Sequence, residues 1–313
     1  LRAVSLDLVG RPPFPSERAN WLDRGRHELL DSLLASEDFW LHWYEEQLYY
    51  FLLIDNFRPE SERLRELPAD LTAGRVHVRD AIQRIALSSS FELRNPGADT
   101  FVTVVLEQLD GIAVQSERRT LEIGKALYDG EPGHFLGRSG SSQSDVVRIA
   151  IEDKRFEREL VAREYRRWLG TEPEDGELAA DARALRASPE VFPELVRRWF
   201  LSPAYDERLA RGSRLENRLF VQAIFVDLLG RLPSVEELRR VRGALDGLSD
   251  PLPLRAVLAR LVLASGQVEL PAKEAIEDPT AWVADQFRRL LGRAASEAEL
   301  ATFVGAFHDP ACQ

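Results

Sequence analysis

Apolar residues recur along most of the chain with the spacing of amphipathic helices, and short polar segments containing glycine or proline separate the runs. Four runs end in an apolar residue followed by glycine, a polar linker and the start of another helix: Gly10, Gly170, Gly230 and Gly292. The last three glycines stand 60 and 62 residues apart. Such regular self-similarity is typical of stacked helical units. We therefore expect an all-α fold, a helical repeat array of helix, Gly/Pro turn and helix.

Each of the four glycines predicts a structural turn at a helix junction. Glycine after the last apolar residue can adopt the left-handed conformation that ends a helix, and a nearby proline prevents the helix from continuing. Two copies then have the serine–glutamate spacing of a capping box: Ser234 with Glu237, and Ser296 with Glu299. The first copy offers Ser16 as an N-cap without a glutamate, and the second offers Glu174 with Glu177.

A second signature, an apolar stretch that ends in serine, closes each unit. It occurs at Ser36, Ser202 and Ser265, with a looser copy at Ser88. The last unit has only 21 residues after its glycine, fewer than the earlier units need to reach this serine. We therefore expect a piece of a longer polypeptide, with a first unit at 1–39, an insertion at 40–160 and tandem repeats at 161–313, the last one truncated.

The insertion begins with the densest aromatic cluster of the chain, which includes Trp40, Trp43, Tyr44, Tyr49, Tyr50 and Phe57. Trp40 and Tyr44 fall on one helical face, which predicts a helix directed at the core. Tryptophan and tyrosine are also enriched at interface hot spots, so these six residues are candidates for a partner-binding face. Farther on, residues 101–109 are rich in valine and threonine but end like a helix, and we expect a helix there.

Residues 128–144 hold four glycines and four serines, which predicts a long loop, either a flexible linker or a packed surface segment. His134 and Arg138 are the residues of this loop that could line a site. The loop lacks the Gly-Lys-Ser/Thr ending of a nucleotide-binding loop, and the chain has no Gly-x-Ser-x-Gly motif for a serine nucleophile. We therefore assign no catalytic residue.

Composition places the chain among ordinary globular proteins, with 44% apolar and 30% charged residues. The formal net charge of −11 argues against a nucleic-acid surface. No apolar run approaches the roughly 18 residues that a membrane-spanning helix needs. The chain has one cysteine, and its five histidines do not have the spacing of metal ligands. We therefore expect no metal site and no cofactor, and a non-catalytic role more than an enzymatic one.

The opening residues 1–13, together with 29–36 and 40–43, resemble an uncharacterised domain family of exported proteins from planctomycete-type and myxobacterial-type bacteria. Members of that family often carry cytochrome c domains. The later units, from 165–170 through 201–205, resemble helical repeats of secreted bacterial surface proteins and, more distantly, phycobilisome linker domains. This chain has no Cys-x-x-Cys-His motif and no methionine, so it departs from the cytochrome architecture and has no covalent haem site.

Two functional hypotheses follow. The first is a non-catalytic scaffold of an exported, periplasmic or cell-surface assembly that binds other protein subunits, either copies of itself or a cytochrome-bearing partner. The second is an accessory helical domain of an exported redox or polysaccharide-processing enzyme, with residues 128–144 lining a site. A pocket converging on His134 or His42 would favour the second hypothesis.

Overall fold

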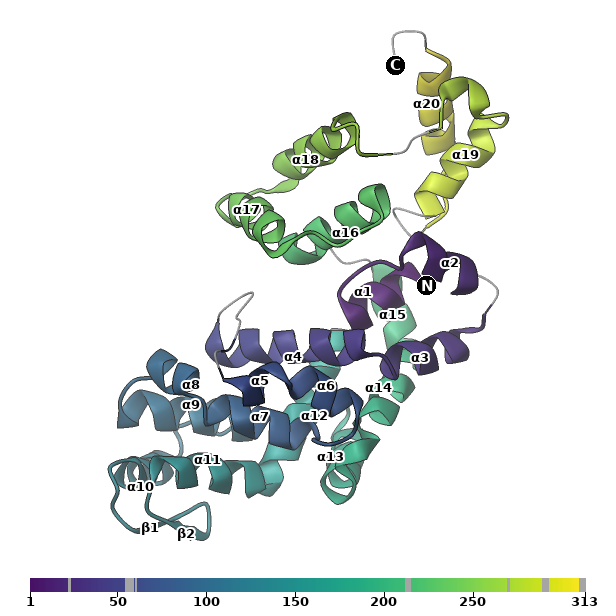
Figure 1. Cartoon of the computed structure of the whole chain (residues 1–313). Coiled ribbons are helices and arrows are strands. Elements are labelled where there is room, and N and C mark those ends of the chain that lie inside the picture. Colours follow the sequence, from purple (N-terminus) through teal and green to yellow (C-terminus); the bar gives the residue numbers. More distant parts are fainter. Residues whose placement is uncertain are drawn as a thin grey trace. The chain divides into compact units, whose positions relative to one another are not determined.

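The computed structural model describes residues 1–21, 24–53, 59, 61–211, 215–268, 271–288 and 293–309. Apart from one short hairpin, the regular elements of these residues are helices, which confirms the all-α prediction (Figure 1). The chain divides into two compact units: unit 1 holds residues 1–29 and 214–313, and unit 2 holds residues 30–213. The boundaries predicted at 39/40 and 160/161 both lie within unit 2.

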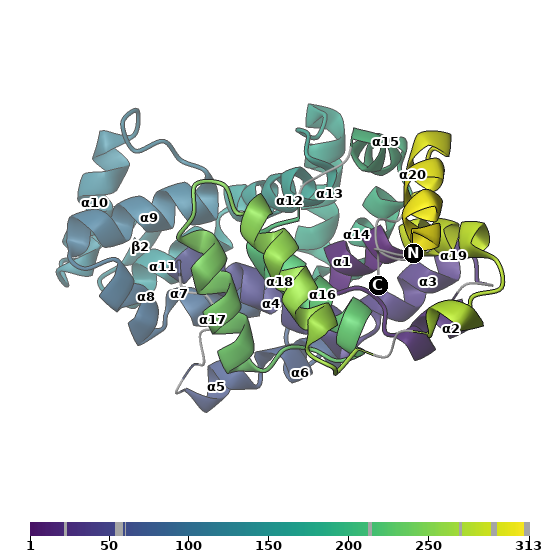
Figure 2. The ribbon, with the colours of Figure 1, turned by 90° about the horizontal axis from the view of Figure 1, so that it is seen from above.

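Unit 2 is a layered helical body that contains the aromatic insertion. Helix α4 contacts α6, α7 and α8, and α12 contacts α9, α13, α14 and α15; Figure 2 shows α12 beside α13. The helix α3 (Arg26–Leu34) crosses the division between the units. The elements of unit 2 are α4 (Glu37–Leu52), α5 (Glu62–Arg65), α6 (Leu67–Thr72), α7 (Val78–Ala86), α8 (Ser89–Arg94), α9 (Ala98–Asp110), α10 (Arg118–Tyr128), β1 (Gly133–Phe135), β2 (Arg138–Gly140), α11 (Gln143–Glu152), α12 (Lys154–Leu169), α13 (Asp175–Ala187), the 3-10 turn η1 (Pro189–Val191), α14 (Phe192–Phe200) and α15 (Pro203–Arg211).

The core of unit 2 is aromatic and joins helices that are distant in sequence. Trp43 of α4 and Trp168 of α12 both pack against Phe192 of α14, with ring centroids 5.7 and 6.2 Å apart. The helix expected over residues 101–109 is confirmed as part of α9, whose Phe101 packs against Phe91. Burial of rings of this size supplies much of the energy that holds such a body together.

The glycine-rich segment 128–144 is more ordered than the expected linker or loop. It forms an antiparallel hairpin in which Gly133 pairs with Gly140, and the hairpin lies against α10 and α11. A Cβ at Gly140 would come within 3.0 Å of side-chain atoms of Leu127 and Ile149, so the glycine permits the strand to pack closely on both helices. Gly133 and Gly140 therefore serve close packing, whereas Gly130 and Gly137 have open space around them and adopt positive φ angles of 91° and 81°.

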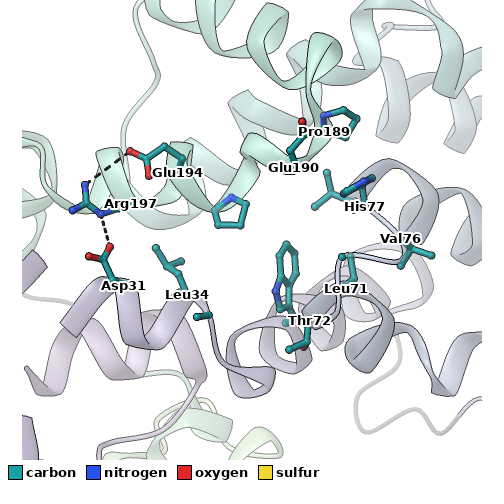
Figure 3. A pocket seen from close by; sticks show the side chains of 15 residues that line it. Asp31, Leu34, Leu71, Thr72, Val76, His77, Pro189, Glu190, Glu194 and Arg197 are labelled. Atoms are coloured by element: carbon teal, nitrogen blue, oxygen red, sulfur yellow. Dashed lines mark hydrogen bonds and ion pairs between the residues drawn. The ribbon is translucent and has the colours of Figure 1, made fainter. Parts of the chain in front are cut away.

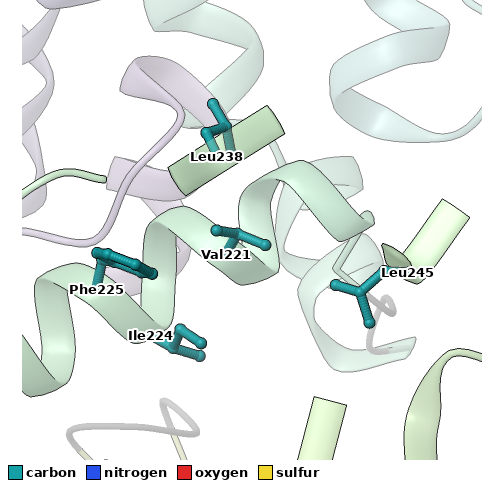
Figure 4. Close-up of a cluster of buried hydrophobic side chains, with 5 residues drawn as sticks. All are labelled: Val221, Ile224, Phe225, Leu238 and Leu245. Carbon is teal, nitrogen blue, oxygen red and sulfur yellow. The ribbon is translucent and has the colours of Figure 1, made fainter. Parts of the chain in front are cut away.

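Unit 1 contains a smaller core. Its central cluster is formed by buried residues of α16 and α17, with α18 packed against it (Figure 4): Val221, Ile224, Phe225, Leu238 and Leu245. Helix α19 packs on α20. The elements of unit 1 are α1 (Arg2–Val9), α2 (Pro15–Trp21), α16 (Asn217–Leu229), α17 (Val235–Asp246), α18 (Leu252–Ala264), the 3-10 turn η2 (Lys273–Ala275), α19 (Pro279–Gln286) and α20 (Glu297–His308).

Three of the four predicted turn glycines end helices as expected. Gly10, Gly170 and Gly230 follow α1, α12 and α16 with φ of 70°, 66° and 66°, which is the left-handed conformation. Gly292 lies outside the described residues. We call these segments Gly junctions. The two predicted capping boxes, at the starts of α17 and α20, are both confirmed.

The prediction that Ser16 caps the second helix is wrong. Helix α2 begins at Pro15, a residue well suited to the first helical turn, so Ser16 lies inside that turn. The backbone N–H of Phe14, before the helix, donates to the carboxylate of Glu17 at 2.7 Å. Glu17 therefore accepts the backbone N–H before its helix in the first copy, as Glu237 and Glu299 do in the later copies. At the remaining junction, Glu174 makes no side-chain capping bond.

An ion pair that the sequence analysis missed recurs at these junctions. The arginine after the glycine bonds through two nitrogens to the glutamate six residues later, with N–O distances of 2.6–2.9 Å: Arg11 with Glu17, Arg231 with Glu237, and Arg293 with Glu299. Gly170 is followed by threonine instead, and there the hydroxyl of Tyr165 donates to Glu177 at 3.3 Å. The spacing Gly-Arg-x5-Glu is the sequence signal of this contact.

The closing serines also share one geometry. Each hydroxyl donates to the carbonyl three residues earlier at 2.6–2.7 Å: Ser36 to Leu33, Ser88 to Ile85, Ser202 to Trp199, and Ser265 to Val262. We call these segments Ser junctions. The two kinds of junction share local geometry from copy to copy, while the repeat array as a whole stays a prediction.

Candidate functional site

The aromatic residues proposed for an interface divide between the core and the surface. Trp40, Trp43 and Tyr44 are buried in unit 2, so the core-facing prediction holds for them and an exposed partner-binding face does not. Trp40 and Trp43 are buried because both rings pack against Phe192 of α14. Tyr49 is 44% exposed and Tyr50 is partly buried. Phe57 lies outside the described residues.

Tyr50 takes part in a buried polar network between α4 and α12. Gln47 donates to Glu164 at 2.7 Å and accepts from Arg163 at 2.6 Å, and the Arg163 guanidinium stacks over the Tyr50 ring at 4.2 Å. His42 of α4 lies 3.3 Å from an Arg167 nitrogen. Buried polar groups that are mutually hydrogen-bonded hold a fixed packing arrangement. These residues therefore have a structural role.

The two loop candidates lie on the hairpin. His134 is exposed, with its Nδ1 3.1 Å from the hydroxyl of Ser139 on the paired strand. Arg138 forms an exposed ion pair with Glu152 of α11. Only Phe135 between them is fully buried. The His134 contact joins the two strands and the Arg138 ion pair fastens the hairpin to α11, and neither supports the hypothesis that this segment lines an enzyme site.

A cavity of about 430 Å³ lies within unit 2, where α3, the segment between α6 and α7, and α14 meet (Figure 3). Trp40 and Leu34 form part of its apolar wall. At one end the Arg197 Nε donates to Asp31 at 2.6 Å, and Glu194 lies on the other side of the same guanidinium, 3.9 Å away. Three carboxylates, including Glu190, face one guanidinium in this lining, so the polar end of the cavity carries an excess of negative charge beside the apolar wall.

Asp110, the last residue of α9, is the buried carboxyl with the most unusual environment. It is 4% exposed, and neither of its oxygens has a hydrogen-bond partner. Burial, reinforced by the charge of Asp153 and by the smaller effects of Glu157 and Glu159, raises the pKa of Asp110 to about 8, although Arg155 opposes this shift. A carboxyl with a strongly shifted pKa can mark a functional site. Asp110 does not line the described cavity, so we expect its shifted pKa to affect the stability of the fold.

Among the described residues of unit 1, helix α18 carries more exposed large apolar side chains than any other helix. Four of its side chains are exposed by 40–61%: Leu252, Val257, Leu261 and Leu263. We call these four residues the α18 surface. The helix carries two charges, both positive: Arg255, which is buried and bonded to Asn217, and Arg260, which is exposed. A helix that is apolar on nearly all sides is normally covered, so this exposure makes the α18 surface the candidate site.

The α18 surface was missed at the sequence level because its apolar run was interpreted only as the closing signature before Ser265. The absence of any acidic residue in the helix, and its spread of leucine and valine over more than one face, are the signals that could have found it.

Comparisons with known proteins give no relative: no family model, curated protein or solved structure matches this chain. In the part of the chain that the structure describes, no group of three or more histidine, cysteine, aspartate or glutamate side chains is arranged to hold a metal ion. Among the same residues, none of the helices is both long and apolar enough to cross a membrane.

Proposed function

We propose that this protein is a non-catalytic interaction module that binds another protein subunit through the α18 surface. The single observation that carries the proposal is the exposure of Leu252, Val257, Leu261 and Leu263 on one helix, with Arg260 as the only exposed charge of that helix. Apolar surface of this extent costs free energy in water and returns about 25 cal/mol per Å² when it is covered.

An extracytoplasmic place for this assembly is part of the proposal. Its support is the resemblance of the opening residues and later units to exported and surface-associated families. Support for the scaffold role over the enzymatic alternative comes from the polar residues that the sequence offered. His134, Arg138 and His42 have structural contacts within unit 2 and do not converge on the described cavity.

The test compares two substitutions that each introduce a negative charge. Each variant is made in the full chain, which is isolated from its host by a small affinity tag. Leu261→Asp places a carboxylate on the α18 surface, and Leu93→Asp places one on an exposed leucine of α8 in unit 2, 81% exposed. We expect the unaltered chain and Leu93→Asp to elute in one stoichiometric complex by size exclusion with light scattering. Leu261→Asp should elute alone with unchanged helical circular dichroism. A monomeric unaltered chain, or equal behaviour of both variants, would contradict the proposal.

A further inference from the structure

Three of the four Ser junctions are followed at once by a helix, which we call the closing helix. The closing helices are α4 after Ser36, α8 after Ser88 and α15 after Ser202. In each, the residue three positions after the serine is aromatic and fully buried: Phe39, Phe91 and Tyr205. The serine, the aromatic residue and the closing helix therefore occur together three times in unit 2.

The contacts at α15 show what a closing helix covers. Tyr205 stacks on Phe200, the residue two positions before Ser202, with ring centroids 4.4 Å apart. Phe200 in turn packs against Trp168 beside the Gly junction. Arg211 of α15 donates to the carbonyl of Leu169 at 3.5 Å. Helix α15 thus covers the end of α14 together with the Gly junction after α12, and Phe200 and Leu169 are 0% exposed.

The fourth Ser junction, in unit 1, has no closing helix among the described residues that follow it. In 266–268 and 271–278 the only regular element is the 3-10 turn η2, and the residue three positions after Ser265 is Val268. The exposure of the residues around this junction agrees with the absence of an aromatic side chain that would cover them. Leu263, two positions before the serine, is 40% exposed, where the corresponding Phe200 is 0% exposed. Leu228 and Leu229 beside Gly230 are only partly buried.

We infer that this position on unit 1 accepts a helix from another polypeptide, and that the first turn of that helix carries a phenylalanine or tyrosine that packs on Leu263. The inference rests on the proposed function, since it names the partner's chemistry at the α18 surface. Charge supports the same occupant. Helix α18 exposes Arg260 and has no acid, while all three closing helices have an acidic residue in the first turn. A second copy of this chain fits less well, because its own three aromatic residues are fully buried.

The experiment supplies the missing helix within the chain. Residues 266–274 are replaced by the sequence of residues 203–211, which places the tyrosine three positions after Ser265. The matched control is the same graft with alanine in place of that tyrosine. We expect the tyrosine graft to raise the melting temperature of the full chain by about 3 °C or more relative to the control graft, because the new ring covers apolar surface. We also expect it to weaken binding of the native partner about tenfold or more.

Equal melting temperatures of two folded grafts would overturn the inference, and so would a homodimer bound through the α18 surface. If loss of the complex in Leu261→Asp persists while the grafts behave alike, the proposed function stands and only the partner's chemistry is wrong. If the tyrosine graft does not fold, a fluorescent peptide with the sequence of residues 202–211 is added to the unaltered chain. We then expect the Tyr205→Ala peptide to bind at least about tenfold more weakly, and equal or absent binding of both peptides contradicts the inference.

Discussion

At the scale of single residues, the buried charges of unit 2 fall into two groups. Glu157, Glu164 and Asp181 are almost fully buried and each is bonded to an arginine or another donor, as buried charges need to be. Asp110 is buried and unpaired. A carboxyl in such a site is accommodated in its protonated form, so this residue makes stability depend on pH.

Asp110→Asn is expected to stabilise the protein in a pH-dependent way. The folded-state pKa of about 8 lies above the ordinary value of 3.8, so the folded state binds the proton more tightly than the unfolded state. The stability of the unaltered chain should therefore fall as pH rises from about 4 to 8 and then level off. Asparagine removes this loss, so the melting temperature of the variant should exceed that of the unaltered chain at pH 9 and differ little at pH 4.

The control for this experiment is Asp99→Asn, at an exposed position on the same helix, where the carboxylate contacts Lys125. It should show no gain at pH 9. A gain from Asp110→Asn that is the same at both pH values would mean that packing, and not the charge, sets its effect.

At the scale of elements, the Gly junction is a compact device that ends one helix and begins the next. Bonds from Arg231 and from the N–H of Ser234 lower the pKa of Glu237 to about 2, and Arg293 with Ser296 does the same for Glu299. The glutamate carboxylate accepts hydrogen bonds both from a backbone N–H at the helix start and from the arginine. The first copy behaves in the same way. Burial alone would raise the pKa of Glu17, but hydrogen bonds from Arg11 and from the N–H of Phe14 lower it below its usual value.

Glu237→Ala should destabilise unit 1 by about 1 kcal/mol at neutral pH, most of it from the lost helix cap, since an exposed ion pair adds little. Because the pKa of Glu237 is depressed, its contribution is present above pH 4.5 and is lost as pH falls toward 2. Thermal unfolding at pH 7 and pH 2 measures the difference. Glu236→Ala, whose partners Arg239 and Arg240 are exposed side chains of the same helix, is the control and should have a smaller effect. An equal loss from both variants would contradict the role of the junction.

The sequence predicted those parts of the structure that depend on neighbours along the chain. Left-handed glycines and capping boxes are set within a few residues, so Gly10, Gly170, Gly230 and the caps of α17 and α20 were predictable. Ser16 was misassigned because the helix begins at Pro15, two residues before the start that an N-cap at Ser16 implies. Contacts between distant residues, such as Gln47 with Glu164, depend on the packing of whole helices and leave no local signal.

The candidate site was hidden for the same reason. An apolar run such as 261–264 predicts burial, and only the placement of neighbouring helices decides whether it is covered. The aromatic cluster at α4 illustrates the opposite error: its composition suits an interface, but α14 already covers Trp43 within unit 2.

At the scale of the whole molecule, the two units differ in how fully their junctions are covered. Unit 2 has closing helices at all of its Ser junctions and buries its aromatic residues, whereas unit 1 leaves the α18 surface exposed. We therefore expect unit 1 to provide the binding surface and unit 2 to act as a stable body that a partner does not need to contact.

Hydrogen–deuterium exchange of the full chain, alone and in the complex isolated from its host, tests this account most directly. Covered amides exchange more slowly because local opening of a bound helix costs more free energy. We expect slower exchange in the complex over residues 252–264 and 226–229. Protection confined to unit 2, for instance at the hairpin 133–140 or the end of α4, with α18 unchanged, would contradict it.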